Sequence, residues 1–142
     1  MRITHVSALA AVLVTLGTAS AAAQADPADT PRQAIARSYL DALVSHDASA
    51  VPFAPDATRV EAGFQTGYSG PQLAHDLEHG LQYRVIQGIR DLTMSESGDT
   101  VTTRYLLDTG VAGVRLTTVE IVETFVIPAD SIQTIEATIT PV

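Results

Sequence analysis

The sequence has 142 residues, with 8 Lys or Arg against 16 Asp or Glu, and its formal net charge is −8 at pH 7. A chain this acidic does not attract nucleic acid or anionic lipid surfaces by charge. It contains no Cys, which excludes disulfide bonds and thiolate chemistry. We therefore expect a fold held by its hydrophobic core alone, with no nucleic-acid partner.

The N-terminus has the pattern of a secretory signal peptide. The first two residues are Met and Arg, residues 6–16 form a short apolar run, and Ala23-Gln24-Ala25 matches an A-x-A cleavage site. The run is too short to span a membrane. We expect cleavage that removes residues 1–25 and leaves one domain over residues 26–142, secreted or periplasmic and without membrane contact. An uncleaved anchor is the alternative.

The first half of the mature chain predicts helices and short strands. Residues 30–33, Thr-Pro-Arg-Gln, form a capping box with Pro at the first helical position. The helix that they begin runs to about Ser45. A short second helix is expected over residues 48–54, and a short strand over residues 57–62.

A loop or bent hairpin is expected over residues 63–69, which contain two Gly. The capping pattern then recurs at Ser69 and predicts another helix, which Gly80 ends. The apolar stripe of this helix consists of Leu73, Leu77 and Leu81.

Four strands joined by short turns follow, over residues 83–94, 101–108, 114–127 and 131–140. Gly88 indicates a bulge in the first of them. Helices first and an antiparallel meander afterwards predict an α+β fold.

The third of these strands carries the main functional clue. Side chains alternate between the two faces of a strand, and one face here consists of Val119, Ile121, Glu123, Phe125 and Ile127. A carboxyl on an otherwise apolar face faces a desolvation cost unless it is protonated or has a partner. We therefore expect the pKa of Glu123 to lie above its ordinary range.

The opposite face of the same strand predicts an interface. It holds Leu116, Val122 and Val126 together with Thr118 and Thr124. A face this apolar favours contact with a partner, so we expect a two-fold homodimer through this sheet.

Three short motifs, in this order and spacing, resemble the NTF2-like superfamily, which includes SnoaL-like cyclases and ketosteroid isomerases. They are residues 38–47 in the first helix, residues 53–58, and residues 123–125 in the penultimate strand. The resemblance implies a cone, with N-terminal helices packed on a curved antiparallel sheet. It also implies a small apolar or polycyclic ligand inside the cone, no cofactor, and a homodimer.

The resemblance to ketosteroid isomerases implies three site residues. The oxyanion tyrosine of that family falls on Tyr39, its base on Glu61, and its protonated oxyanion-hole acid on Glu123. Both acids are Glu here, one methylene longer than the Asp of the family. The expected pocket wall consists of Phe53, Phe64, Leu77, Val119, Ile121 and Phe125.

Several interpretations of these residues stay open. A buried Tyr39–Glu123 hydrogen bond could be purely structural, the cone could carry a ligand or serve as a dimerisation module without catalysis, or it could perform isomerase, cyclase or dehydratase chemistry. His75 and His79 lie one helical turn apart, a spacing that can bind zinc, but a third ligand is not evident and a solvated helix face is favoured. Arg59 and Arg104 fit an anionic ligand or ordinary ion pairs.

Overall fold

The computed structural model describes residues 28–142, and the predicted leader lies outside this range. Among these residues, no helix is long and apolar enough to cross a membrane. The elements, in chain order, are α1 (Pro31–Ser45), β1 (Phe53–Glu61), β2 (Phe64–Gly67), α2 (Gly70–His79), β3 (Ile86–Ser97), β4 (Thr100–Val111), β5 (Val114–Val126) and β6 (Ile132–Pro141).

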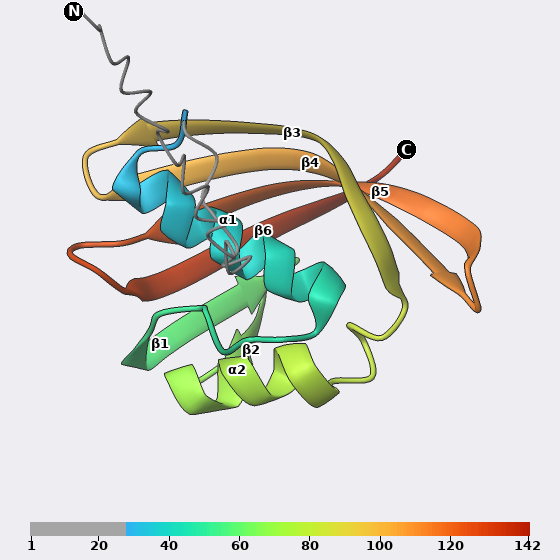
Figure 1. Cartoon of the computed structure of the whole chain (residues 1–142), viewed down its shortest axis with the longest axis horizontal. Helices are drawn as coiled ribbons and strands as arrows, with labels where there is room; N and C mark the ends of the chain where they lie inside the picture. The colour runs from blue at the N-terminus through green and yellow to red at the C-terminus, as the bar shows by residue number, and fades with distance from the viewer. Residues whose placement is uncertain (1–27) are drawn as a thin grey trace, which may run out of the picture.

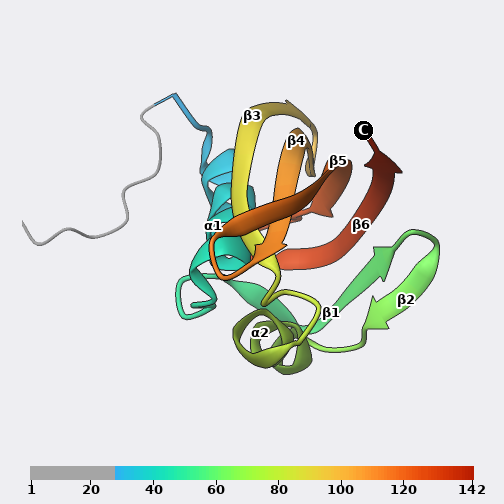
Figure 2. The ribbon, with the colours of Figure 1, turned by 90° about the vertical axis from the view of Figure 1, so that its right-hand side faces the viewer.

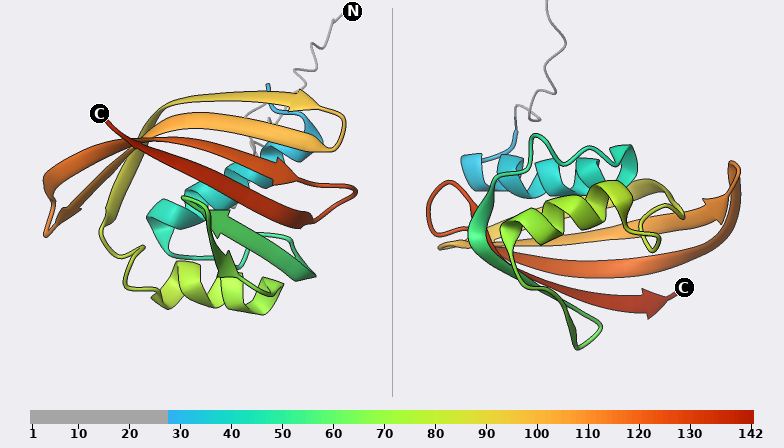
Figure 3. Two further views of the ribbon diagram at one scale, coloured as in Figure 1. Left: turned by 180° about the vertical axis from the view of Figure 1, so that it is seen from behind. Right: turned by 90° about the horizontal axis from the view of Figure 1, so that it is seen from below.

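The strands form one six-stranded sheet in the order β2-β1-β6-β5-β4-β3. The predicted antiparallel meander is confirmed for β3 to β6. However, β1 runs parallel to β6, so the sheet as a whole is mixed. The long strands curve around α1 (Figure 1; Figure 2), and both helices lie on one side of the sheet (Figure 3, right). The predicted α+β cone is therefore confirmed.

Side-chain caps set the helix starts as predicted. The Thr30 side chain accepts a hydrogen bond from the Gln33 backbone N–H, and the Gln33 side-chain oxygen accepts one from the Thr30 backbone N–H. At α2, Ser69 accepts from the backbone of Gln72. The prediction that Leu81 extends the apolar stripe is wrong, because α2 ends at His79 and Leu81 is 74% exposed.

The helix predicted over residues 48–54 is absent, and β1 begins inside that range. Phe53 pairs with Ile132 of β6, and the Pro52 carbonyl accepts a hydrogen bond from the Ile132 backbone at 2.8 Å. Pro52 disfavours a helical residue before it, so pairing with β6 prevails over the weak helical pattern.

A β-hairpin occupies the region expected to be a loop or bent hairpin. Ala62 and Gly63 both have positive φ, 49° and 83°, which suits the two-residue turns that join antiparallel strands. β2 pairs with β1 across this turn. At the other end of α2, turns occupy residues 81–85, so β3 starts three residues later than predicted. The predicted bulge is confirmed by a register shift at Gly88.

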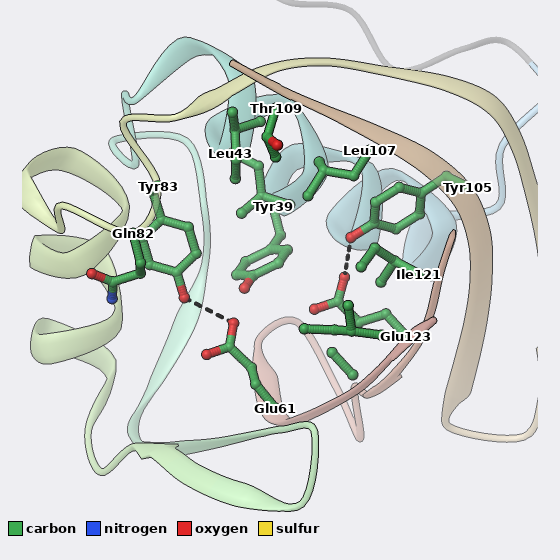
Figure 4. A pocket seen from close by; sticks show the side chains of 13 residues that line it. Tyr39, Leu43, Glu61, Gln82, Tyr83, Tyr105, Leu107, Thr109, Ile121 and Glu123 are labelled. Atoms are coloured by element: carbon green, nitrogen blue, oxygen red, sulfur yellow. Dashed lines mark hydrogen bonds between the residues drawn. The ribbon is translucent and has the colours of Figure 1, made fainter. Parts of the chain in front are cut away.

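The core lies between α1 and the concave face of the sheet. The alternation predicted for β5 is confirmed, since Ile121, Glu123 and Phe125 are buried while Leu116 is 70% exposed. Tyr39 of α1 meets Phe125 edge-on, with ring centroids 5.3 Å apart. This contact fixes α1 over β5 and places the Tyr39 hydroxyl beside the carboxyl-bearing part of the strand (Figure 4).

Candidate functional site

A cavity of about 220 Å³ lies where α1 faces the curved strands, and Tyr39, Glu61 and Glu123 all line it (Figure 4). The three predicted site residues are thus brought together from α1, β1 and β5. Gln82 and Ile139 line the cavity and are exposed to solvent, so they mark its rim. The other lining residues are Leu43, Tyr83, Ile86, Tyr105, Leu107, Thr109, Ile121 and Ala137.

Of the six residues expected to form the pocket wall, Ile121 is among the lining residues. Leu77 and Phe125 are instead fully enclosed by other core side chains, and Phe64 is 74% exposed on β2. Phe53 and Val119 are half-buried against the core. Alternation along a strand predicts the face of a side chain, but it does not predict whether the side chain meets open volume or a neighbour.

Glu123 is 2% exposed and hydrogen-bonded through one carboxylate oxygen. The Tyr105 hydroxyl donates to Oε2 at 2.8 Å. Burial raises the pKa of Glu123 to about 8; the Tyr105 hydrogen bond and the charge of Arg59 lower it, and the charge of Glu61 raises it further. The expected upward shift therefore has the predicted physical cause, and Glu123 is a neutral acid at pH 7.

Tyr105, rather than Tyr39, is the hydrogen-bond partner of Glu123. In the sequence it was one of several aromatic residues without an assigned role. The β4–β5 pairing places Tyr105 opposite Ile121, two residues from Glu123 and on the same face. The short turn between β4 and β5 could have predicted the Tyr105–Glu123 contact, because the register of a hairpin follows from its turn.

Glu61 lies at the end of β1, and each of its oxygens has a partner. Oε1 accepts a hydrogen bond from the Tyr83 hydroxyl at 3.0 Å, and Oε2 lies 3.5 Å from Arg59 Nε. Tyr83 belongs to the turn between α2 and β3, a position that strand periodicity could not predict. Glu61 is therefore held between a phenol and a guanidinium at the edge of the cavity.

The three phenols at the cavity are neutral hydrogen-bonding groups. Burial is the largest cause that raises the pKa of Tyr39, Tyr83 and Tyr105 above the ordinary range, and nearby carboxylate charge adds to it. Each phenol therefore keeps its proton at physiological pH and can donate it.

Arg59 is a buried cation behind the cavity wall, and it makes the ion pairs that were one of its two expected roles. Its side chain is 0% exposed, its Nε lies 3.0 Å from Thr66 Oγ1, and its Nη2 lies 3.4 Å from Asp76 Oδ2. The guanidinium also lies 5.1 Å from the ring centroid of Tyr83. Burial lowers the pKa of Arg59, but the neighbouring Tyr39, Tyr83 and Glu61 raise it more, so the residue stays charged.

The remaining candidates lie outside the cavity. His75 and His79 are exposed on α2, with ring centroids 4.9 Å apart. Within residues 28–142, no group of three or more His, Cys, Asp or Glu side chains is arranged to hold a metal ion. Arg104 lies on the outer face of the sheet and pairs with Glu120 at 2.8 Å.

The sequence matches, over residues 27–139, the profile of a family described as a domain of unknown function, DUF8021. A search of curated proteins finds no match.

Solved structures share the fold at low sequence identity. An LEH-like epoxide hydrolase from M. tuberculosis is 15% identical, with a TM-score of 0.65 over 80% of this chain and 85% of that one. A putative isomerase of the SnoaL-like family from Agrobacterium tumefaciens str. C58 is 16% identical, with a TM-score of 0.60 over 78% and 98%. An NTF2-like protein of unknown function from Cytophaga hutchinsonii ATCC 33406 is 16% identical, with a TM-score of 0.59 over 79% and 91%.

Proposed function

The chain belongs to the DUF8021 family and has the NTF2-like fold, and we propose that it binds a small, mostly apolar molecule in its cavity. The supporting observation is a cavity with an apolar wall into which two carboxyls and three phenols project. Pockets for drug-sized ligands enclose about 300–1,000 Å³. The volume of about 220 Å³ therefore favours a ligand smaller than the polycyclic molecules that the resemblance implied.

The polar groups define what the ligand must carry. Neutral Glu123 and the Tyr39 phenol can donate hydrogen bonds, while the Glu61 carboxylate can accept one. We propose a ligand with an oxygen acceptor at one position, directed toward Glu123 and Tyr39. An apolar ring or chain of the ligand fills the remaining space between the Leu and Ile side chains.

Acid–base catalysis is the second candidate, and the different surroundings of the two carboxyls favour it. In this reaction Glu61 removes a proton from the carbon beside a ligand carbonyl; the C–H electron pair forms a carbon–carbon double bond, and the π pair of the carbonyl moves to its oxygen. Tyr39 and Glu123 then donate hydrogen bonds to the enolate. Returning the proton to another carbon completes an isomerisation without a cofactor.

The contacts of Glu61 favour instead a carrier without catalysis. Both carboxylate oxygens already have partners, Tyr83 and Arg59, so accepting a proton requires Glu61 to weaken one of these contacts. Because the sequence predicts a leader, we propose that either activity occurs outside the cytoplasm.

A ligand panel tests binding on the predicted mature chain, residues 26–142. Cyclohexenone, cyclohexene oxide, cyclohexanone and methylcyclohexane are added, and the backbone amide signals are followed by NMR. We expect saturable shifts confined to residues around the cavity. Ala137→Leu places a larger side chain at the cavity wall and should weaken binding at least tenfold, whereas Thr138→Leu, on the opposite face of β6, should not.

Product analysis of the same mixtures separates the two candidates. Turnover of the enone or epoxide that disappears in Glu61→Gln, with binding retained, supports catalysis. Binding without turnover for every compound supports the carrier. If no compound shifts the signals of lining residues at millimolar concentration, the proposed binding is wrong.

A further inference from the structure

The carboxyl group of Glu123 has two unlike oxygens. Oε2 accepts the hydrogen bond of Tyr105 at 2.8 Å. The other oxygen, Oε1, makes no hydrogen bond with the described part of the chain. Figure 4 shows this oxygen turned away from Tyr105, toward the space between Tyr39 and Glu61. One oxygen is therefore committed to the protein, and the other faces the cavity.

The direction of the Tyr105 hydrogen bond decides where the acid proton resides. Tyr105 is the donor in this hydrogen bond, and it keeps its own proton because burial raises its pKa above the ordinary range. With Tyr105 donating to Oε2, the single proton of the neutral carboxyl is left on Oε1. The reverse arrangement, in which Glu123 donates to Tyr105, would turn the acid proton away from the cavity.

We propose that Tyr105 is a positioning residue that directs the proton of Glu123 into the cavity, where it meets an acceptor oxygen of the ligand. This inference rests on the proposed binding of an oxygen-bearing molecule. It adds to what the resemblance to ketosteroid isomerases implied, which gave roles to Tyr39, Glu61 and Glu123 but none to Tyr105 of β4.

The other groups facing Glu123 do not replace this role. Tyr39 approaches from α1, and Arg59 and Glu61 approach from β1. The charges of Arg59 and Glu61 act on the pKa of Glu123, but in the described part of the chain none of the three hydrogen-bonds its carboxyl group. Tyr105 is the residue whose hydrogen bond lowers the pKa of Glu123. Removing its hydroxyl should therefore raise that pKa further and release the constraint on the proton.

Tyr105→Phe tests the inference with the ring retained, and Tyr83→Phe is the matched control, because it removes the hydroxyl that serves Glu61. The carboxyl carbon of Glu123 is followed by NMR through a pH titration. We expect its midpoint to move up by about one pH unit in Tyr105→Phe, as the loss of one such hydrogen bond suggests. We expect no movement in Tyr83→Phe.

Binding supplies a second measurement. Cyclohexanone accepts a hydrogen bond and methylcyclohexane does not, although their sizes are similar. Tyr105→Phe should weaken cyclohexanone binding about tenfold and leave methylcyclohexane binding unchanged. Glu123→Gln provides a further variant, since an amide that accepts from Tyr105 turns its NH₂ group to the cavity. Glu123→Gln should therefore retain cyclohexanone binding. The double variant with Tyr105→Phe should lose it, because the amide is then no longer oriented.

Each outcome decides the inference. An unchanged Glu123 midpoint in Tyr105→Phe, or equal weakening of both probes, would overturn it. If neither probe binds the unaltered protein, the proposed function fails. The titration of Glu123 then still shows whether Tyr105 acts on its carboxyl group. An equal shift of the Glu123 midpoint in Tyr105→Phe and Tyr83→Phe counts against a specific role of Tyr105.

Discussion

The two faces of β5 hold glutamates in contrasting surroundings. Glu123 lies on the concave face, 2% exposed, with the neutral Tyr105 as its partner. Three residues earlier, Glu120 lies on the outer face and pairs through both oxygens with Arg104, at 2.8 and 2.9 Å. The same side chain on the same strand is thus a neutral hydrogen-bond donor on one face and half of an ion pair on the other.

This contrast shows that the face of the strand on which a glutamate lies, rather than its residue type, sets its protonation and its partners. A buried carboxyl without a cation beside it is held in its neutral form by desolvation. An exposed carboxylate is hydrated and gains little from its ion pair. Changes on the concave face should therefore have large effects, and changes on the outer face small ones.

The largest loss of stability is expected for Phe125→Ala. Phe125 is 0% exposed and meets Tyr39 edge-on, so its truncation leaves a cavity that core side chains cannot close. We expect a loss of about 3–5 kcal/mol in the free energy of unfolding, measured by urea denaturation. Leu116→Ala on the outer face, where Leu116 is 70% exposed, should cost less than about 0.5 kcal/mol. Comparable losses in the two variants would contradict the contrast between the faces.

A pH-dependent loss of stability is expected from Glu123. Its pKa rises from 4.5 to about 8 on folding, so between these values the folded chain holds a proton that the unfolded chain releases. The contribution is fully present below pH 4.5, declines by up to about 1.4 kcal/mol per pH unit, and is lost above pH 8. Glu123→Gln cannot ionise and should lack this decline. Chemical denaturation at pH 5, 6, 7 and 8 measures the difference; parallel pH profiles would show that Glu123 is not the neutral acid described.

The concave face was predictable in outline because its helices and strands follow simple sequence patterns. Capping residues set both helix starts, and the period of two placed Glu123 among buried neighbours. The sequence did not predict the hydrogen-bond partners of the two carboxyl groups. Tyr83 reaches Glu61 from an irregular turn, and Tyr105 reaches Glu123 across a strand pair. Both contacts depend on three-dimensional register rather than on local pattern.

Arg59 is a charged residue whose contacts local sequence patterns also failed to predict. Arg is rarely buried without partners, so a surface position or an ion pair was the ordinary expectation. Its partners Thr66 and Asp76 come from β2 and α2, and β2 was expected only as a loop or bent hairpin. A buried cation becomes plausible once these elements surround it. Local sequence reasoning could not assemble that environment.

The outer face of the sheet differs from the concave face in carrying the surface proposed to form a dimer. We propose that Leu116, Val122 and Val126 contribute to a two-fold homodimer, although the Arg104–Glu120 pair makes this face more polar than its β5 residues alone suggest. Leu116→Glu should weaken such a dimer at least tenfold, or about 1.4 kcal/mol. Sedimentation at micromolar concentration measures this change. A monomer for the unaltered chain would count against the proposal.

The smallest effect is expected at the outer ion pair itself. A double-mutant cycle of Arg104→Ala and Glu120→Ala should give a coupling of about 0.2–1 kcal/mol, because both side chains keep contact with water. In 1 M salt the Debye length falls to about 3 Å, so this coupling should decrease. The equivalent cycle of Tyr105→Phe and Glu123→Ala at pH 6 links two neutral, buried groups and should change little with salt. Equal salt sensitivity would mean that Glu123 is charged in the folded protein, and the distinction between the faces of β5 would then reduce to exposure alone.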